Sequence, residues 1–429
     1  MRRRAAVLAF LLVGVCVPAL HAQTAQTGTQ KEKEEDPWFR PPNSIRLGEF
    51  RLDLRVRLHQ DFKRFSPDLD FTGWEPTFRR ARVGVQGRIY DDLEYDLDAE
   101  LRDKDHPWRN VYLNYRRFQA AEVRVGRFKV PFGREQLETV FEIDFLERSL
   151  INSTLTPTRS TGLMVAGELA EGVVEYRTGI FRDDGDSSRF EAVFIETDRF
   201  EDVRAGEGSW GGRIVVRPWE RSRGRLRRLE AGAGITLTDM DTGLFGPEGR
   251  TLSGYTFSEP VYVNGRRTRL GVDGAWAVGP FGVQAEYIRL QDQRNGQGLG
   301  DVDLPDAVAQ GWYVSGSWNL TGERATQENT PRRPLFRGGI GALELAARIE
   351  ALRFGSVDTA GEAPFANPRA ANILENRDRI VSLGLNWYPN RWGRVMLNFT
   401  REEIKDPERS PILGRTTFWG TACRLQLVL

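Results

Sequence analysis

The chain has 429 residues, of which 40% are hydrophobic and 28% are charged, with a mean hydropathy of −0.47. This composition excludes a polytopic helical membrane protein, which needs repeated apolar runs of about 20 residues, but not a membrane β-barrel, whose strands are only half apolar. Without Arg2, Arg3 and Arg4 the 61 basic residues fall to 58 against 60 acidic ones, so the net charge changes from +1 to −2. This balance gives no global basic field of the kind that binds nucleic acid.

The first residues have the pattern of a secretory signal. The three arginines precede an apolar stretch from Ala5 to Val17, and Ala22 is a small residue suited to cleavage. We therefore expect residues 1–22 to be a signal peptide and residues 23–44 to be a polar, flexible lead-in. Cys423 would then be the one cysteine of the exported chain, which excludes an internal disulfide.

From Ile45 onward the hydrophobic pattern has period two. In residues 50–58, apolar Phe50, Leu52 and Leu54 alternate with charged Arg51 and Asp53, and the alternation continues to Leu58. Residues 81–89 and 93–101 alternate in the same way. Strict alternation over eight or nine residues predicts β-strands.

Thirteen further segments fit the same pattern, which gives sixteen strands in total. Their connections alternate between short and long, as expected when hairpins close into a barrel; the exceptions are a short link near 103–106 and a long link at 321–339. A soluble propeller would show a repeat near 40 residues, and the sequence has none. We predict an all-β, transmembrane antiparallel barrel over residues 45–429. The additional strands are expected at 107–117, 120–130, 161–170, 172–182, 209–218, 229–239, 266–277, 281–290, 310–320, 340–354, 378–388, 394–404 and 415–429.

Aromatic residues gather near the ends of these strands, as in the two interfacial girdles of membrane barrels. A soluble all-β protein with scattered surface aromatics is the alternative interpretation. The expected girdle residues are Tyr90, Tyr115, Phe118, Trp210, Trp219, Trp276, Trp387, Tyr388, Trp392 and Trp419.

A row of arginines follows the polar side of the first two strands. A charge on the lipid face costs about 2–4 kcal/mol at the bilayer midplane, so these arginines are expected to face the lumen. They could form an anion path, because the planar guanidinium donates two parallel hydrogen bonds to phosphate. Equally, they could pair with the acidic third strand. The row comprises Arg51, Arg55, Arg57, Arg80, Arg82 and Arg88, and the acidic strand carries Glu94, Asp96, Asp98 and Glu100.

Five stretches of the sequence carry a family resemblance: RRARVGVQGRIYDDLEYDLDAEL (79–101), NVYLNYRRF (110–118), VRVGRFKVPFGREQL (123–137), FLERSL (145–150) and PTRSTGLMVAGEL (157–169). Together they resemble the phosphate-selective porins O and P. The stretch from Gly126 to Gly133 is the most specific. The resemblance implies a sixteen-stranded outer-membrane barrel, commonly a homotrimer. It also implies that the third long loop, here Pro131 to Thr161, folds into the lumen, and that pore arginines and lysines attract anions such as phosphate.

These expectations define a set of candidate pore-lining residues. Lys129 lies on the outward parity of its strand, so a bulge or the strand end must redirect it. Pro131 marks that end, because proline cannot donate to a ladder. The loop also carries Glu135, Glu138, Glu142, Asp144 and Glu147, which would weaken the attraction for anions. The candidates are Arg55, Arg57, Arg80, Arg82, Arg88, Lys129, Arg134, Arg148 and Arg159. Those expected at the constriction are Arg80, Arg82, Lys129, Arg134, Arg148 and Arg159.

Enzymatic interpretations find little support. Outside the signal peptide the histidines are His59 and His106, both expected on the loop side of strands, and no GxSxG, HExxH or Walker motif occurs. The acidic segment 182–191 lacks EF-hand spacing.

We expect no cofactor and no metal. The expected function is passive diffusion of small solutes, with anions favoured and outer-membrane lipid around the barrel. The alternatives are a general, sugar or carboxylate porin, a non-conducting barrel whose loops bind a ligand, and a barrel enzyme using a histidine.

Overall fold

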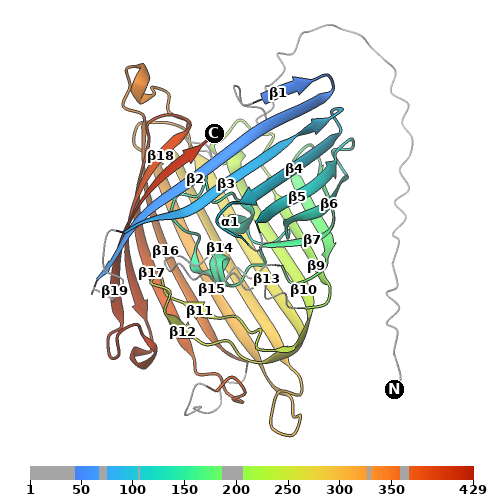
Figure 1. The fold of residues 1–429 in the computed structure, drawn as a ribbon, viewed down its shortest axis with the longest axis vertical. Coiled ribbons are helices and arrows are strands. Elements are labelled where there is room, and N and C mark those ends of the chain that lie inside the picture. The colour runs from blue at the N-terminus through green and yellow to red at the C-terminus, as the bar shows by residue number, and fades with distance from the viewer. Residues whose placement is uncertain (1–43, 67–74, 105–106, 186–205, 326–329, 358–366) are drawn as a thin grey trace. The chain divides into compact units, whose positions relative to one another are not determined.

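The computed structural model describes residues 44–66, 75–104, 107–185, 206–325, 330–357 and 367–429. The chain divides into the units Met1–Phe39 and Arg40–Leu429, and the predicted signal peptide lies outside the described residues. In the second unit, sixteen strands pair antiparallel, each with its neighbour in the chain, and β19 pairs with β2 to close the ring (Figure 1). The predicted fold class is confirmed. The strands are β2 (Phe50–Ser66), β3 (Glu75–Ile89), β4 (Leu93–Glu100), β5 (Trp108–Tyr115), β6 (Glu122–Lys129), β7 (Arg159–Leu169), β8 (Val174–Phe181), β9 (Ser209–Val216), β10 (Leu229–Gly243), β13 (Val263–Val278), β14 (Phe281–Arg294), β15 (Leu304–Asn319), β16 (Ala342–Ser356), β17 (Asn376–Tyr388), β18 (Gly393–Ile404) and β19 (Thr417–Val428).

The period-two pattern separates an apolar outside from a polar inside. In β17, Val381, Leu383 and Leu385 are exposed on the outside, whereas Ser382 and Asn386, of opposite parity, are buried. Exposed apolar side chains stabilise a barrel only where lipid replaces water. The fold therefore has the surface of a membrane barrel. None of the helices among the described residues has the length and apolarity needed to span a membrane.

All sixteen predicted strands are present, and the largest difference lies at the first two. Strand β2 continues past Leu58 to Ser66, and β3 begins at Glu75. A β-bulge explains the missed half of β3: His59 pairs with Arg80 and Gln60 pairs with Phe78, so Arg79 is the extra residue. A bulge inserts one residue and breaks the strict alternation of its own strand. In β2 the pattern is lost for another reason, because polar Gln60 and Arg64 share the parity of apolar Leu58.

Short strands and helices that the alternation did not predict occupy the ends and loops of the barrel. Strand β1 (Ser44–Leu47) pairs with the start of β2, and β11 (Gly249–Arg250) pairs with β12 (Thr256–Ser258). The 3-10 helices are η2 (Arg225–Arg228), η3 (Leu335–Arg337) and η4 (Pro407–Arg409).

The third long connection, residues 130–158, folds into the lumen as expected; we call it the constriction loop. It contains α1 (Arg134–Leu137) and α2 (Leu150–Thr154), and α1 is drawn inside the ring of strands in Figure 1. Helix α2 contacts β15 and β16, although the loop begins and ends at β6 and β7. The loop therefore crosses the lumen to the far wall.

A second connection, residues 244–262 between β10 and β13, also folds inward; we call it the plug loop. Leu252 and Phe257 from this loop join a buried apolar cluster with Phe354, Ile380 and Phe418 of β16, β17 and β19. The ring of Phe257 packs edge-on against Phe354 with centroids 5.6 Å apart. The sequence pattern indicated a long connection at 240–265 but not its inward path.

Candidate pore site

Hydrogen bonds from the wall to the backbone of the constriction loop are the first of its attachments. Wall carboxylates accept from its amides: Glu286 Oε1 accepts from Arg134 N at 2.7 Å, and Glu350 Oε2 accepts from Leu150 N at 2.5 Å. Wall donors bind its carbonyls: Gln426 Nε2 donates to Phe141 O at 2.8 Å. Such bonds fix both distance and direction, so the loop follows one path across the lumen. Further donors to loop carbonyls are Arg269 to Leu155, Arg348 to Glu147, Asn386 to Asp144, Arg394 to Ile143 and Arg424 to Leu146.

Wall glycines make room for apolar side chains of the same loop. A Cβ atom at Gly271 would lie 3.1 Å from the ring of Phe132, and one at Gly234 would lie 3.2 Å from it. At Gly311 it would lie 2.5 Å from the side chain of Ile151. A larger residue at any of these three positions would collide with the loop, so the glycines provide the space in which its apolar side chains pack.

The predicted arginine row faces the lumen and is paired with the acidic strand. Arg82 Nε lies 3.0 Å from Glu100 Oε2, and Arg88 Nη2 lies 3.1 Å from Glu94 Oε1. These two pairs are the cross-strand pairs that the sequence had left as the alternative to an anion path. The row's other contacts are Arg55 with Asp96, Arg57 with Asp98 at 3.8 Å, and Arg80 with Glu147 at 3.6 Å.

Phe141 of the constriction loop packs against this row. The guanidinium carbons of Arg57 and Arg82 lie 5.3 and 5.7 Å from the centre of its ring. An aromatic face attracts cations by about 0.5–2 kcal/mol. The ring therefore holds two arginine head groups beside the loop without neutralising their charge.

The other expected constriction cations bind the loop itself or the wall. Lys129 Nζ turns inward at the strand end, as predicted, and donates to Leu137 O and Glu138 O at 3.1 and 2.6 Å. Arg148 donates to Glu135 O and Glu138 O at 3.0 and 2.6 Å. Their charges lie against backbone carbonyls at the centre of the loop. Arg134 contacts Glu230, with Glu138 at 3.6 Å, and Arg159 donates to Asn110 Oδ1 at 2.9 Å.

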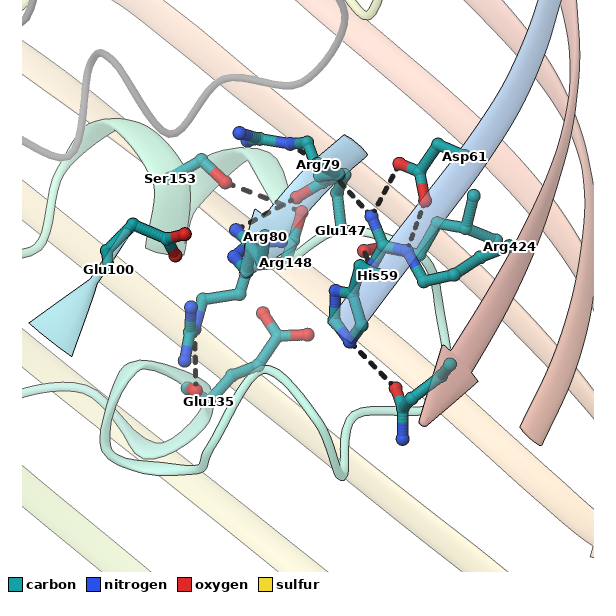
Figure 2. Close-up of polar contacts among 12 residues, drawn as sticks. His59, Asp61, Arg79, Arg80, Glu100, Glu135, Glu147, Arg148, Ser153 and Arg424 are labelled. Carbon is teal, nitrogen blue, oxygen red and sulfur yellow. Dashed lines mark hydrogen bonds and ion pairs between the residues drawn. The ribbon is translucent and has the colours of Figure 1, made fainter. Parts of the chain in front are cut away.

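Glu147 is the hub of an ion cluster that joins the loop to the wall. Figure 2 shows its carboxylate between Arg79, Arg80 and Arg424. Arg79 Nε lies 3.1 Å from Oε1, Arg80 Nη2 lies 3.6 Å from Oε2, and Arg424 Nη2 lies 3.1 Å from Oε1. Burial would raise the pKa of Glu147, but the guanidinium groups outweigh burial and lower it to about 2.

The expectation for His59 was wrong, and one expected girdle residue faces inward. His59 lies in mid-strand, fully buried, with Nε2 2.9 Å from Gln426 Oε1 and its ring against Phe141. The strand end was placed too early because polar Gln60 follows Leu58 on the apolar parity of the strand. Tyr388 Oη donates to the lumen residue Glu344 at 3.3 Å, and Arg394 lies over its ring. His106 lies outside the described residues.

Several residues that hold the loop were missed. Glu286, Glu350 and Arg424 lie on the inward parity of their strands, and an inward charge was the available signal. Their partners on the constriction loop lie 134 to 278 positions away along the chain. In the described part of the chain, no group of three or more His, Cys, Asp or Glu residues could hold a metal.

A closed sixteen-stranded barrel with an apolar outside, a charged inside and a loop laid across its lumen is a porin. Comparisons with known proteins give the family. Residues 50–237 and 245–427 match the model of the family described as "Phosphate-selective porin O and P". The chain belongs to this family, and it is an outer-membrane channel protein rather than an enzyme.

Individual relatives are distant in sequence. Porin O of Pseudomonas aeruginosa is 24% identical over 367 residues, which is 80% of this chain and 80% of Porin O. The trimer form of OmpT from Vibrio cholerae is 12% identical, covers 88% of this chain and 99% of OmpT, and has a TM-score of 0.53. The anion-selective porin from Comamonas acidovorans is 11% identical, covers 88% and 99%, and has a TM-score of 0.50.

Proposed function

We propose that this porin lets small anions of the phosphate class diffuse passively across the bacterial outer membrane. The observation that carries the proposal is the arginine row on β2 and β3 beside the constriction loop. The side chains of Arg55 and Arg57 are 12% and 18% exposed, so both can meet a solute. A row of similar sites lets an anion move along without a deep trap.

Two further points support an anion preference. The Phe141 ring attracts Arg57 and Arg82 to its face without adding a further carboxylate to Asp98 and Glu100, which already contact them. The family is described as phosphate-selective, and the Comamonas porin of similar fold is described as anion-selective. Export through a cleaved signal peptide and assembly as a homotrimer belong to the same proposal. The trimer form of the OmpT neighbour supports the second of these.

The test is a reversal potential. The purified protein is inserted into a planar bilayer under a chloride gradient, and phosphate is then added. We expect an anion-selective current that phosphate reduces, with both effects weakened by Arg57→Ala. Arg117→Ala is the control, because Arg117 is exposed in a turn. A cation-selective current in the parent protein would refute the proposal.

A general porin with little charge preference is the second candidate, and the paired wall favours it. Arg82 with Glu100 and Arg88 with Glu94 are ion pairs within the row, and paired charges attract passing anions less. This candidate predicts a reversal potential near zero that Arg57→Ala leaves unchanged. The same bilayer experiment therefore separates the two.

A further inference from the structure

Two connections at the rim that carries the short turns have a high density of positive charge. Residues 219–228, between β9 and β10, contain five arginines and one glutamate, and residues 330–340, between β15 and β16, contain three arginines and no acidic residue. All eight arginines are exposed. We call these two stretches the basic segments. They differ from the chain as a whole, in which 61 basic residues are balanced by 60 acidic ones.

Each basic segment is attached to a tryptophan on the outside of the barrel. Trp276 of β13 donates its indole N–H to Arg225 O at 2.9 Å, and Trp387 of β17 donates its indole N–H to Ile340 O at 2.8 Å. Both tryptophans have the outward parity of their strands, which is the parity of the exposed valines and leucines. The basic segments are therefore tied to the lipid-facing side of the rim.

The tryptophans also indicate the depth of the basic segments in the membrane. Aromatic side chains on the outside of a membrane barrel gather at the level of the lipid head groups. Between the two segments, Phe281 and Trp318 continue this girdle: they are 49% and 45% exposed, and their rings stack with centroids 5.7 Å apart. Because the short turns of such barrels face the periplasm, the arginines lie at the head groups of the periplasmic leaflet.

The positive charge of the basic segments exceeds the negative charge around it. In the described part of the chain, three carboxylates contact the segments, which leaves an excess of five positive charges over the eight arginines. Ion pairs between exposed side chains are weak, so a bound anion can replace them. The carboxylates are Glu171, 3.1 Å from Arg221, Glu220, 3.5 Å from Arg227, and Glu323, which accepts from the amide of Arg332 at 3.2 Å.

We propose that the basic segments bind anionic phospholipid of the periplasmic leaflet. The planar guanidinium groups match the oxygens of a head-group phosphate, and clusters of about four to eight basic residues beside a membrane-spanning segment are typical of anionic-lipid recognition. Leu226 and Phe336, which are 42% and 84% exposed, supply apolar contacts for the acyl chains. A soluble acidic partner would use the arginines but not these apolar side chains. The surface lies outside the lumen, so the proposal does not depend on the solute that the pore conducts.

The test measures lipid binding to the purified protein in a neutral detergent. Phosphatidylglycerol is titrated in, with phosphatidylcholine of the same acyl chains as the comparison, and native mass spectrometry records the lipid concentration at half-maximal occupancy. We expect phosphatidylglycerol to bind more tightly than phosphatidylcholine. The triple variant Arg223→Gln, Arg225→Gln, Arg227→Gln should raise the half-occupancy concentration of phosphatidylglycerol about tenfold or more. These changes keep the backbone carbonyl that binds Trp276.

A second triple variant tests the other basic segment: Arg332→Gln, Arg333→Gln, Arg337→Gln should shift phosphatidylglycerol binding in the same direction. The control is Arg117→Gln, Arg266→Gln, Arg415→Gln, which removes the same charge from three exposed arginines outside the basic segments and should leave binding near the parent value. An equal shift in the control would show a response to net charge alone and would overturn the proposal. Equal binding of the two lipids by the parent protein would also overturn it, in favour of a soluble acidic partner.

Discussion

The two loops inside the barrel share an apolar cluster but differ in their charged contacts. Phe132 and Ile151 of the constriction loop pack into the same cluster as Leu252 and Phe257 of the plug loop, and wall side chains hydrogen-bond to the backbone of both loops. The constriction loop also forms ion pairs with the wall through Glu147. Hydrophobic burial is non-directional, while a charged hydrogen bond fixes distance and angle. The comparison indicates that the ion pairs set the path of the constriction loop across the lumen and that the plug loop fills space beside it.

The sharpest test of this difference is Arg424→Ala. The change leaves the buried carboxylates of Asp61 and Glu147 without their shared partner, and removing one member of a buried ion pair costs about 3–5 kcal/mol. We expect a loss at the upper end of that range, measured as the free energy of unfolding in guanidinium chloride. Arg117→Ala, at an exposed pair, should change it by less than about 1 kcal/mol. An equal effect of the two variants would contradict the assigned role.

The matching change in the plug loop is Phe257→Ala. Removing this buried ring should cost about 3 kcal/mol, because it leaves a cavity against Phe354. Single-channel conductance should rise as the plug loop loosens, while the anion-to-cation permeability ratio stays constant. A changed permeability ratio would show that the plug loop, like the constriction loop, positions charge.

A smaller effect is expected from pH. The pKa of Glu147 is lowered from its ordinary value of 4.5 to about 2, so the folded state binds this proton less readily than the unfolded state. The stability that Glu147 contributes is therefore complete above about pH 4.5 and is lost as the pH falls toward 2. Unfolding followed between pH 6 and 2.5 should show this decrease, and Glu147→Gln should reduce it. The plug loop variant Phe257→Ala should retain the parent's dependence on pH.

The smallest expected change concerns one backbone anchor. Glu286→Ala removes the acceptor of Arg134 N and Asn152 Nδ2, and an unsatisfied buried donor costs about 1–3 kcal/mol. We expect about 2 kcal/mol, together with larger current fluctuations in single channels as the loop leaves its single path. Steady current with unchanged stability would show that water replaces the carboxylate.

The features that could be predicted from the sequence are those set by the alternation within a strand and by the order of neighbouring strands. The pairs of Arg82 with Glu100 and Arg88 with Glu94 follow from strand order, because adjacent strands of one hairpin place their inward residues side by side. The inward path of the constriction loop came from a family resemblance. The hub around Glu147 was not predictable, since Arg424 lies 277 positions away and a bulge brings in Arg79. The inward path of the plug loop was missed because two apolar residues in a long connection form no pattern.

The fit between the wall glycines and the constriction loop has a consequence for chimeric porins. Phe132 needs Gly234 and Gly271, and Ile151 needs Gly311, so the constriction loop and the far wall are fitted as a pair. A chimera that receives this loop from a relative would pack its side chains against mismatched wall residues unless the facing wall residues are transferred with it. In this barrel the constriction loop and the strands opposite therefore have to be exchanged together, although they are far apart in the sequence.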